Sequence, residues 1–276
     1  MLMEVEIMRA IKKTMTLHNG VKIPLIGFGT WQISENEVED AVLEAIKVGY
    51  RHIDTAHSYG NEKGVGRAIK KSGIPREQLF ITTKLPSHIK TYDEAKVYLK
   101  ESFENLDVDY IDLILIHAPW PWSDVGRNCD EGNKEVWRHF EELYEQGLVK
   151  SIGVSNFSVH DLENIMQDSQ VVPHVNQIAF HIGHVKSDVV EFCNEHDILI
   201  QAYSPLATGR LLNHQTLKDM ADKYNVTVAQ LAIRYCIEKD TLPLPKSVTP
   251  KYIYENTLVD FKIDELDLKI LDEIKL

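Results

Sequence analysis

The sequence predicts an α/β fold, specifically a (β/α)8 TIM barrel formed as a single domain over residues 1–276. Two observations lead to this prediction. Short apolar runs rich in β-branched residues alternate with amphipathic helical patterns, and eight such runs occur along the chain. The length of 276 residues also suits one barrel, for which roughly 250 residues are typical.

The first element expected is a β-hairpin. In the string LHNGVKI, Asn19 and Gly20 stand between two short extended runs, and this dipeptide is a strong signal for a tight turn. We expect the hairpin to plug one end of the barrel. Residues 1–13 precede it, and we expect them to form a flexible N-terminal extension.

The eight predicted strands are apolar runs bounded by polar or turn-forming residues. They cover Leu25–Gly29, His52–Ala56, Leu79–Leu85, Asp112–Ala118, Lys150–Ser155, Val175–Phe180, Leu199–Tyr203 and Leu242–Pro245. Helices are predicted where apolar residues recur every three or four positions. They cover Val38–Val48, Tyr92–Asn105, Glu135–Glu145, Val159–Gln167, Ser187–Glu195 and Val228–Glu238. After the last strand, TPKYIYENTLVDF and DELDLKILDEI predict two closing helices.

Composition and charge narrow the possible partners. The net charge of −12 argues against binding nucleic acid or an anionic membrane, because both need a basic surface. The sequence shows no apolar stretch of 18 residues and no signal-peptide pattern. Cys129, Cys193 and Cys236 are widely spaced, which indicates reduced thiols. We therefore expect a cytoplasmic protein, and the acidic surface without an interface motif suits a monomer.

Four ionisable residues fall at the ends of consecutive predicted strands, where a parallel barrel builds its active site. Asp54 lies in the second strand, Tyr59 just past it, Lys84 at the end of the third and His117 at the end of the fourth. Taken singly, Asp54 could cap a loop and Tyr59 could be a packing residue. Their joint placement on one rim favours catalysis.

The chemistry of these four side chains suits proton donation. An ammonium in an apolar strand needs a carboxylate partner, so Lys84 is expected to pair with Asp54. Lys84 beside the Tyr59 hydroxyl should lower the pKa of Tyr59 from about 10. Tyr59 would then be the acid, and His117 would donate a hydrogen bond to a substrate oxygen or share the proton. This machinery has no electron source.

An ordered series of motifs carries a resemblance to a known family. Over about residues 16–274, the chain resembles the aldo-keto reductase family, especially its small microbial members. The motifs are GFGTW, YRHIDTAHSYGNEKGVGRAI, FITTKL, IDLILIHAPWP, GLVKSIGVSNF, NQIAFH, QAYSPLATG and LPKSVTPKYIYEN. The resemblance implies that Asp54, Tyr59, Lys84 and His117 are the catalytic residues and that Tyr59 is the proton donor. It also implies a nicotinamide dinucleotide that transfers hydride to a carbonyl carbon.

The resemblance further implies the cofactor contacts. Ser155, Asn156 and Gln177 would hold the carboxamide, and Tyr203 would stack on the nicotinamide ring. From the residues alone, Ser155 and Asn156 could simply cap the following helix, and Tyr203 could be core. The other implied cofactor contacts are Gly29, Thr30, Asp54, Ser204, Leu206, Gly209, Lys246, Ser247, Thr249, Glu255 and Asn256. The string GVGRAI has two of the three glycines of the dinucleotide fingerprint, but it does not directly follow a strand, and we interpret it as helix packing.

Three positions depart from the family pattern. Tyr252 stands where many NADPH-preferring relatives carry an arginine, so Tyr252 can stack on adenine but cannot pair with the 2′-phosphate. NADPH preference should then rest on Lys246, helped by Lys251, with NADH still usable. Pro86 and Ala118 stand where relatives often have tryptophan, which widens the substrate pocket.

The expected substrates are aldehydes, α-keto compounds and some ketones, all small carbonyl molecules. Trp31, Tyr59, His117 and Trp120 are the expected substrate contacts. The loop Pro119–Gly132 contains both Trp120 and Trp122, which either refill the widened pocket or pack within the loop.

Three alternatives remain from the sequence. The His-x-x-His spacing in HIGH, His181–His184, suggests a metal-dependent hydrolase, although it lacks a third ligand and the predicted site contains no metal. A barrel of this kind could bind NADPH as a regulatory subunit without turnover. A sugar-phosphate isomerase would use Lys246 in a phosphate cup but would need a catalytic carboxylate.

Overall fold

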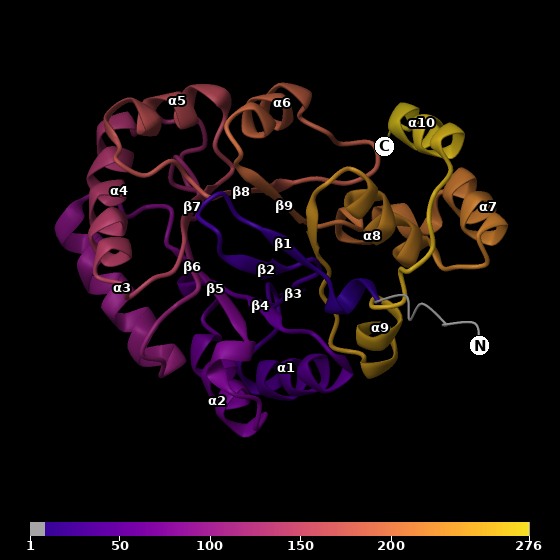
Figure 1. Ribbon diagram of the computed structural model, residues 1–276, viewed down its shortest axis with the longest axis horizontal. Coiled ribbons are helices and arrows are strands. Elements are labelled where there is room, and N and C mark those ends of the chain that lie inside the picture. The colour runs from indigo at the N-terminus through magenta and orange to yellow at the C-terminus, as the bar shows by residue number, and fades with distance from the viewer. Residues whose placement is uncertain (1–8, 276) are drawn as a thin grey trace, which may run out of the picture.

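The computed structural model describes residues 9–275 and shows a barrel of parallel strands surrounded by helices (Figure 1). The eight strands follow one another in sequence order across the sheet, each parallel to its neighbours. They are β3 Phe28–Gly29, β4 His52–Asp54, β5 Phe80–Leu85, β6 Leu113–Ile116, β7 Ile152–Ser155, β8 Val175–Ala179, β9 Leu199–Tyr203 and β10 Leu242–Leu244. The predicted (β/α)8 TIM barrel is confirmed.

Backbone hydrogen bonds close the barrel between its first and last strands. Gly27 N donates to Pro243 O at 3.1 Å, and Gly29 N donates to Pro245 O at 3.0 Å. Strand β3 has only two residues, so the seam that it forms with the last strand is short.

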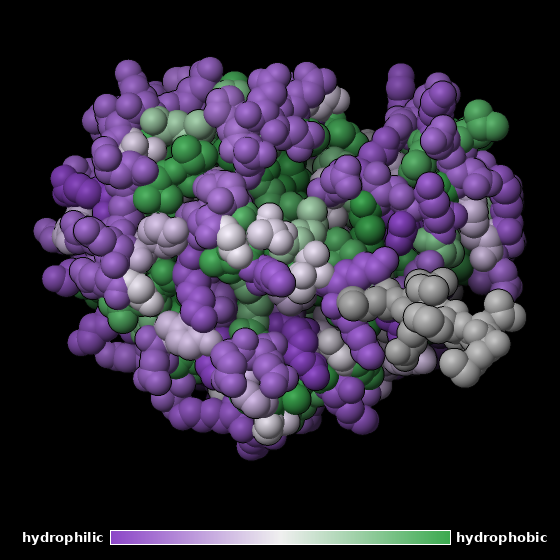
Figure 2. Space-filling view, in the orientation of Figure 1, coloured by the Kyte–Doolittle hydropathy of each residue, from purple (hydrophilic) through white to green (hydrophobic). Residues whose placement is uncertain are grey.

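Ten α-helices occur within residues 9–275. They are α1 Glu35–Val48, α2 Glu62–Lys71, α3 Tyr92–Leu106, α4 Asp130–Glu145, α5 Val159–Asp168, α6 Ser187–Glu195, α7 Gln215–Lys223, α8 Val228–Glu238, α9 Pro250–Glu255 and α10 Glu265–Glu273. Their apolar faces pack on the outside of the strands in the larger of two core clusters. The face of the molecule seen in Figure 2 is mostly hydrophilic. Over this part of the chain, every helix is too short or too polar to cross a membrane.

The hairpin closes the amino-terminal end of the barrel, as expected. Its strands, β1 Thr14–Thr16 and β2 Lys22–Pro24, pair antiparallel around a turn in which Gly20 has φ +86°. Leu17 and Ile23 of the hairpin join the smaller core cluster inside the barrel, with side chains of β5, β6, β8 and β10. The inner cluster consists of Leu17, Ile23, Phe80, Leu113, Leu115, Val175, Leu242 and Leu244.

The expectation of a flexible extension over residues 1–13 needs correction for the part that the structure describes. Residues 1–8 lie outside the described range. Residues Ala10–Lys12 form a 3₁₀ turn, and the side chains of Ala10 and Ile11 are almost fully buried. These two apolar side chains extend the core, so residues 9–13 belong to the packed fold rather than to an extension.

The two glycines of GVGRAI lie in α2 at helix contacts. A Cβ at Gly64 would clash with a methyl group of Val38, and one at Gly66 would lie 2.5 Å from the carbonyl oxygen of Leu106. Both positions therefore need glycine so that α2 can approach α1 and the end of α3. This agrees with their interpretation as helix packing and not as a phosphate loop.

Candidate active site

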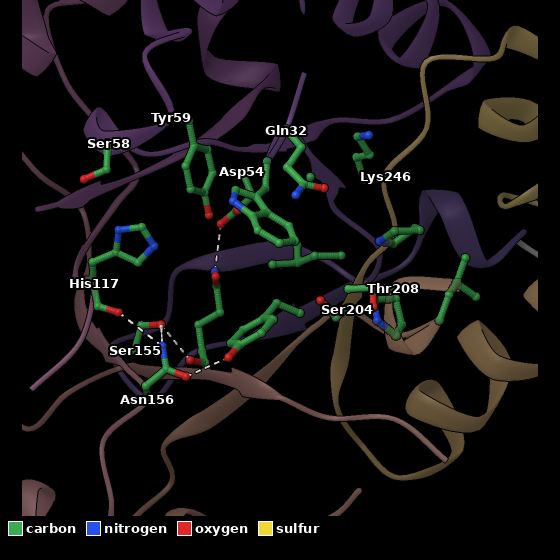
Figure 3. A pocket seen from close by; sticks show the side chains of 18 of the residues that line it. Gln32, Asp54, Ser58, Tyr59, His117, Ser155, Asn156, Ser204, Thr208 and Lys246 are labelled. Atoms are coloured by element: carbon green, nitrogen blue, oxygen red, sulfur yellow. Dashed lines mark hydrogen bonds between the residues drawn. The ribbon is translucent and has the colours of Figure 1, made fainter. Parts of the chain in front are cut away.

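A cavity of about 800 Å³ opens at the carboxyl ends of the strands, opposite the hairpin. This volume is within the usual range for ligand sites. The cavity is lined by Gly29, Trp31, Gln32, Asp54, Ser58, Tyr59, His117, Trp122, Ser155, Asn156, Gln177, Tyr203, Ser204, Pro205, Leu206, Thr208, Gly209, Leu244, Pro245 and Lys246. Many of these side chains are drawn in Figure 3.

A buried ion pair lies beneath the cavity. Lys84 is fully buried, and its Nζ donates to Asp54 Oδ2 at 2.7 Å and to the carbonyl oxygen of Thr55 at 2.8 Å. These side chains meet because β4 and β5 are neighbours and both side chains point into the barrel. Burial lowers the pKa of Lys84, but the charge of Asp54, the nearby Tyr59 and their hydrogen bonds outweigh it, so the pKa is raised and Lys84 stays charged.

Tyr59 lies above this pair, at the end of the 3₁₀ turn His57–Tyr59 that follows β4. Its hydroxyl is 3.3 Å from Lys84 Nζ. The expected lowering of the pKa of Tyr59 is wrong for this structure: burial raises the pKa, and the charge of Asp54 adds to this, while Lys84 only partly offsets it. Tyr59 therefore keeps its proton at neutral pH.

His117 faces Tyr59 across the cavity wall, with ring centroids 5.6 Å apart (Figure 3). Burial, and secondarily the charge of Lys84, lowers the pKa of His117 to about 3. The imidazole is therefore neutral at physiological pH and carries one N–H. A neutral imidazole in this place can donate one hydrogen bond to a ligand oxygen.

A network of amides and hydroxyls forms the wall next to His117. Tyr203 Oη donates to Asn156 Oδ1 at 2.8 Å, and Asn156 Nδ2 donates to the carbonyl oxygen of His117 at 3.2 Å and to Ser155 Oγ at 3.0 Å. Gln177 Nε2 donates to Asp54 Oδ1 at 2.7 Å. The network thereby joins the amide wall to the buried ion pair, and its groups suit a ligand that carries a carboxamide.

The other side of the cavity contains the segment 204–209 and Lys246 (Figure 3). Ser204, Thr208 and Gly209 all have positive φ, of 52°, 54° and 94°. Non-glycine residues in this region are strained, and such strain is frequent at ligand sites. Lys246 is exposed and forms no ion pair within the described part of the chain, so its charge is available to an anionic ligand. The cavity thus fits an elongated ligand with an amide at one end and negative charge at the other.

Several residues predicted from the resemblance do not line the cavity. Thr30 is fully buried and holds the backbone of Asp54, because its hydroxyl donates to Asp54 O at 3.0 Å. Trp120 packs edge-on against Trp122, with ring centroids 4.8 Å apart, and Trp122 is the tryptophan that lines the cavity. The remaining ones lie beyond Lys246, before α9, within it or directly after it: Ser247, Thr249, Tyr252, Glu255 and Asn256.

Seven lining residues were not among the predicted site residues: Gln32, Ser58, Trp122, Pro205, Thr208, Leu244 and Pro245. Gln32 and Ser58 are next to the predicted site residues Trp31 and Tyr59. Gln32 also has φ +60°, a backbone feature that its sequence does not reveal. The proximity to a motif was the only available signal.

The histidine pair His181 and His184 does not form a metal site with other side chains. The two rings are 5.3 Å apart, and the backbones of the two residues are hydrogen-bonded to each other. Within residues 9–275, no three His, Cys, Asp or Glu side chains are grouped so that they could hold a metal ion.

Fold and site together define a parallel barrel whose acid–base chemistry lies at the carboxyl ends of its strands. The family model "Aldo/keto reductase family" matches residues 25–276. The chain belongs to the aldo/keto reductase family and is an oxidoreductase.

Relatives and solved structures agree with this assignment. The glyoxal reductase of Bacillus subtilis (strain 168) is 39% identical, over 96% of this chain and 94% of its own length. The methylglyoxal reductase DkgA of Escherichia coli (strain K12) is 40% identical, over 91% and 90%. A crystal structure of an aldo/keto reductase from Brucella melitensis is 44% identical with a TM-score of 0.89, over 95% and 98%. A Bombyx mori aldo-keto reductase in complex with NADP is 32% identical with a TM-score of 0.86, over 95% and 92%.

Proposed function

We propose that this protein reduces aldehydes, α-keto compounds and some ketones to alcohols, using NADPH as the reductant and Tyr59 as the proton donor. The observation that carries the proposal is the position of the Tyr59 hydroxyl at the cavity wall, 3.3 Å from the Nζ of a buried, ion-paired Lys84. The names of the relatives, which include glyoxal, methylglyoxal and aldehyde reductases, agree with carbonyl reduction.

The four catalytic side chains divide the work. Tyr59 donates its proton to the carbonyl oxygen as negative charge develops there. Lys84 is close enough to stabilise the phenolate that remains, and Asp54 keeps Lys84 charged and in place. His117, which is neutral, orients the substrate oxygen by donating a hydrogen bond.

The proposed nicotinamide site is the amide wall. Ser155, Asn156 and Gln177 would hold the carboxamide, and the ring of Tyr203, fixed by its bond to Asn156, would provide a stacking surface. A nicotinamide dinucleotide bound there supplies the hydride. Gly29, Ser204, Leu206 and Gly209 line the path from this wall towards Lys246.

NADPH preference is proposed to rest on Lys246. Lys251 is less available, because it lies 3.7 Å from Glu255 Oε1 one turn along α9. Tyr252 is 54% exposed and offers a ring for stacking but no charge. We further propose that Ser247, Thr249, Glu255 and Asn256 contact the adenosine end. NADH, which lacks the 2′-phosphate, should remain usable.

The cofactor proposal predicts a selective effect of Lys246→Met. The kcat/KM for NADPH should fall about tenfold, which corresponds to about 1.4 kcal/mol for one lost charge pair, and that for NADH should stay within twofold. Steady-state kinetics with both cofactors measure this. Lys251→Met serves as the matched control, with a smaller expected loss. A wild type that uses NADH as well as NADPH would contradict the preference.

The carbonyl substrate is proposed to bind between Trp31, Tyr59 and His117. Trp31 is 48% exposed and lines the mouth, so the substrate end is open to solvent. The sequence suggested Trp120 as a substrate contact, but Trp122 lines the cavity, so we propose Trp122 for this role.

The function is tested by following NADPH absorbance with methylglyoxal, a benzaldehyde and an α-keto ester. Tyr59→Phe should reduce turnover by at least a thousandfold while NADPH still quenches protein fluorescence, because only the proton donor is lost. Wild-type turnover in Tyr59→Phe would contradict the assignment of the acid. Binding of NADPH without reduction of any carbonyl by the wild type would favour a regulatory role.

We also propose that the protein is a cytoplasmic monomer. Its cysteines are free thiols, and Cys193 and Cys236 are buried. Cell fractionation and light scattering of the purified protein test this proposal.

A further inference from the structure

A second mostly buried lysine, Lys90, lies on the segment between β5 and α3. Unlike Lys84, it forms no ion pair with a carboxylate among residues 9–275. Its Nζ donates to the carbonyl oxygen of Ala118 at 2.9 Å and to Asn133 Oδ1 at 2.7 Å. Burial lowers the pKa of Lys90 to about 8, and the charges of Cys129 and Asp161 only partly offset this. The two hydrogen bonds, rather than an ion pair, therefore hold the Lys90 ammonium in place.

Those hydrogen bonds join the two ends of one loop. The loop runs from His117, just after β6, to Cys129, just before α4. Ala118 lies near its start, and Asn133 lies in the first turn of α4, just past its end. Asn133 is itself buried, and its Nδ2 donates to the carbonyl oxygen of Pro119 at 3.0 Å. At Gly132, a Cβ would lie 2.8 Å from the backbone oxygen of Lys90, so the loop end packs directly on the lysine backbone. Lys90 and Asn133 therefore act together as a clamp on the loop.

The clamped loop carries an aromatic wall of the cavity. Trp122 lines the cavity, and its ring centroid is 6.2 Å from that of His117. The backbone N–H of Trp122 donates to Ser87 Oγ at 3.2 Å, and Ser87 lies three residues before Lys90. The segment that contains Ser87 and Lys90 thus holds the loop at its start, its end and at Trp122.

We propose that Lys90 is a specificity-determining positioning residue that fixes Trp122 at the carbonyl-binding end of the cavity. Lys90 reaches two acceptors, Ala118 O and Asn133 Oδ1, which lie at opposite ends of the loop. It can do so because an ammonium has three donors and the lysine side chain is long. This inference rests on the proposed function, because the wall that Trp122 forms is the wall of the proposed substrate pocket.

The test compares two substrates of different size in Lys90→Met, Lys90→Arg and a matched control. Lys134→Met is the control, since Lys134 is a surface residue of α4 that pairs with Asp168 at 2.7 Å. In Lys90→Met, the KM for a benzaldehyde should rise about tenfold, and the KM for methylglyoxal should stay within twofold. Lys90→Arg keeps the positive charge and the hydrogen-bond donors. Its increase in log KM for the benzaldehyde should therefore be at most half of that in Lys90→Met. Lys134→Met should alter neither KM.

A second measurement reports on the loop without turnover. Arg127 is exposed in the loop, so trypsin cleavage after Arg127 should be at least fivefold faster in Lys90→Met than in the wild type. If Lys90→Met does not fold, Ser87→Ala replaces it, with a smaller change expected in the same direction. An unchanged KM ratio, or equal changes for both substrates, overturns the inference. A wild type that reduces neither carbonyl overturns the proposed function, and the cleavage rate then shows whether the clamp itself exists.

Discussion

At the scale of single residues, Tyr59 shows a competition between burial and charge. The sequence correctly indicated that Lys84 needs Asp54, because an ammonium in an apolar strand is too costly without a carboxylate. It did not reveal how far the Tyr59 hydroxyl is removed from water, and in the structure this burial outweighs the attraction of Lys84. Whether burial or the charge of Lys84 has the larger effect on the pKa of Tyr59 depends on three-dimensional packing, which the sequence alone does not show.

The buried ion pair predicts a non-additive stability effect. Lys84→Met leaves Asp54 buried without its partner, so the free energy of unfolding should fall by about 3–5 kcal/mol. Combining it with Asp54→Asn should recover more than about 1 kcal/mol of this loss, because the stranded charge is then removed. Urea denaturation of the wild type, both single variants and the double variant measures the coupling. Additive losses would show that the two side chains act independently.

Three buried histidines predict acid sensitivity. Burial lowers the pKa of His52 and of His117 to about 3 and that of His174 to about 4, below the ordinary value of about 6.5. At a pH between the folded-state pKa and the ordinary pKa, the unfolded chain binds more protons than the folded chain. The stabilising contribution of each neutral histidine is therefore fully present above about pH 6.5 and is lost as the pH falls. Each histidine contributes up to about 1.4 kcal/mol per pH unit.

His174→Gln isolates one of these contributions, since His174 lies outside the cavity. Between pH 6 and 4.5, the free energy of unfolding should change less steeply with pH. The reduction in slope should be about that caused by one proton, about 1.4 kcal/mol per pH unit. An unchanged slope in His174→Gln would contradict a neutral buried ring.

At the scale of elements, patterns located most strands and helices but not all of their ends. Helices α6 and α8 have the predicted bounds, and α4 begins at Asp130, five residues before its predicted start. Helix α7 was not predicted, because its sequence is mostly polar and only Leu217, Met220 and Ala221 are buried. Its packing against α8, and not its own periodicity, decides its structure.

The approach of α2 to the end of α3 predicts the effect of Gly66→Ala. Alanine improves helix propensity by about 1 kcal/mol, but its Cβ would lie 2.5 Å from the Leu106 carbonyl oxygen, which cannot move without shifting α3. The net result should be a lower melting temperature, measured by thermal unfolding. Lys63→Ala on the exposed side of α2 is the control, with little change expected. A stabilised Gly66→Ala protein would mean that the two helices separate freely.

At the scale of the whole molecule, the two ends of the barrel have separate roles. The hairpin and the inner apolar cluster fill the amino-terminal end, and the polar chemistry occupies the carboxyl end. The sequence predicted this division, because the polar residues stood at strand ends and the Asn19–Gly20 turn preceded the first strand. Which tryptophan of the loop faces the cavity depends on the clamp at Lys90, and residue type alone did not show it.

This division predicts that Ile23→Ala affects stability more than catalysis. Ile23 is fully buried in the inner cluster, so the variant should lose about 2–4 kcal/mol of unfolding free energy. Its kcat/KM at 20 °C should remain within threefold of the wild type, because the hairpin lies away from the cavity. Calorimetry and steady-state kinetics test the two halves of this prediction. A large loss of turnover in well-folded protein would show that the plug also shapes the active site.

The short seam between β3 and β10 is a place where a bound ligand could change the local stability of the barrel. Gly29 and Lys246 lie on either side of it, and both line the cavity. A dinucleotide that contacts both residues would connect the two strands across this short seam and stabilise the closure of the barrel. Loading the protein should then slow amide hydrogen exchange at Gly27 and Gly29 more than at strands remote from the joint, such as β6.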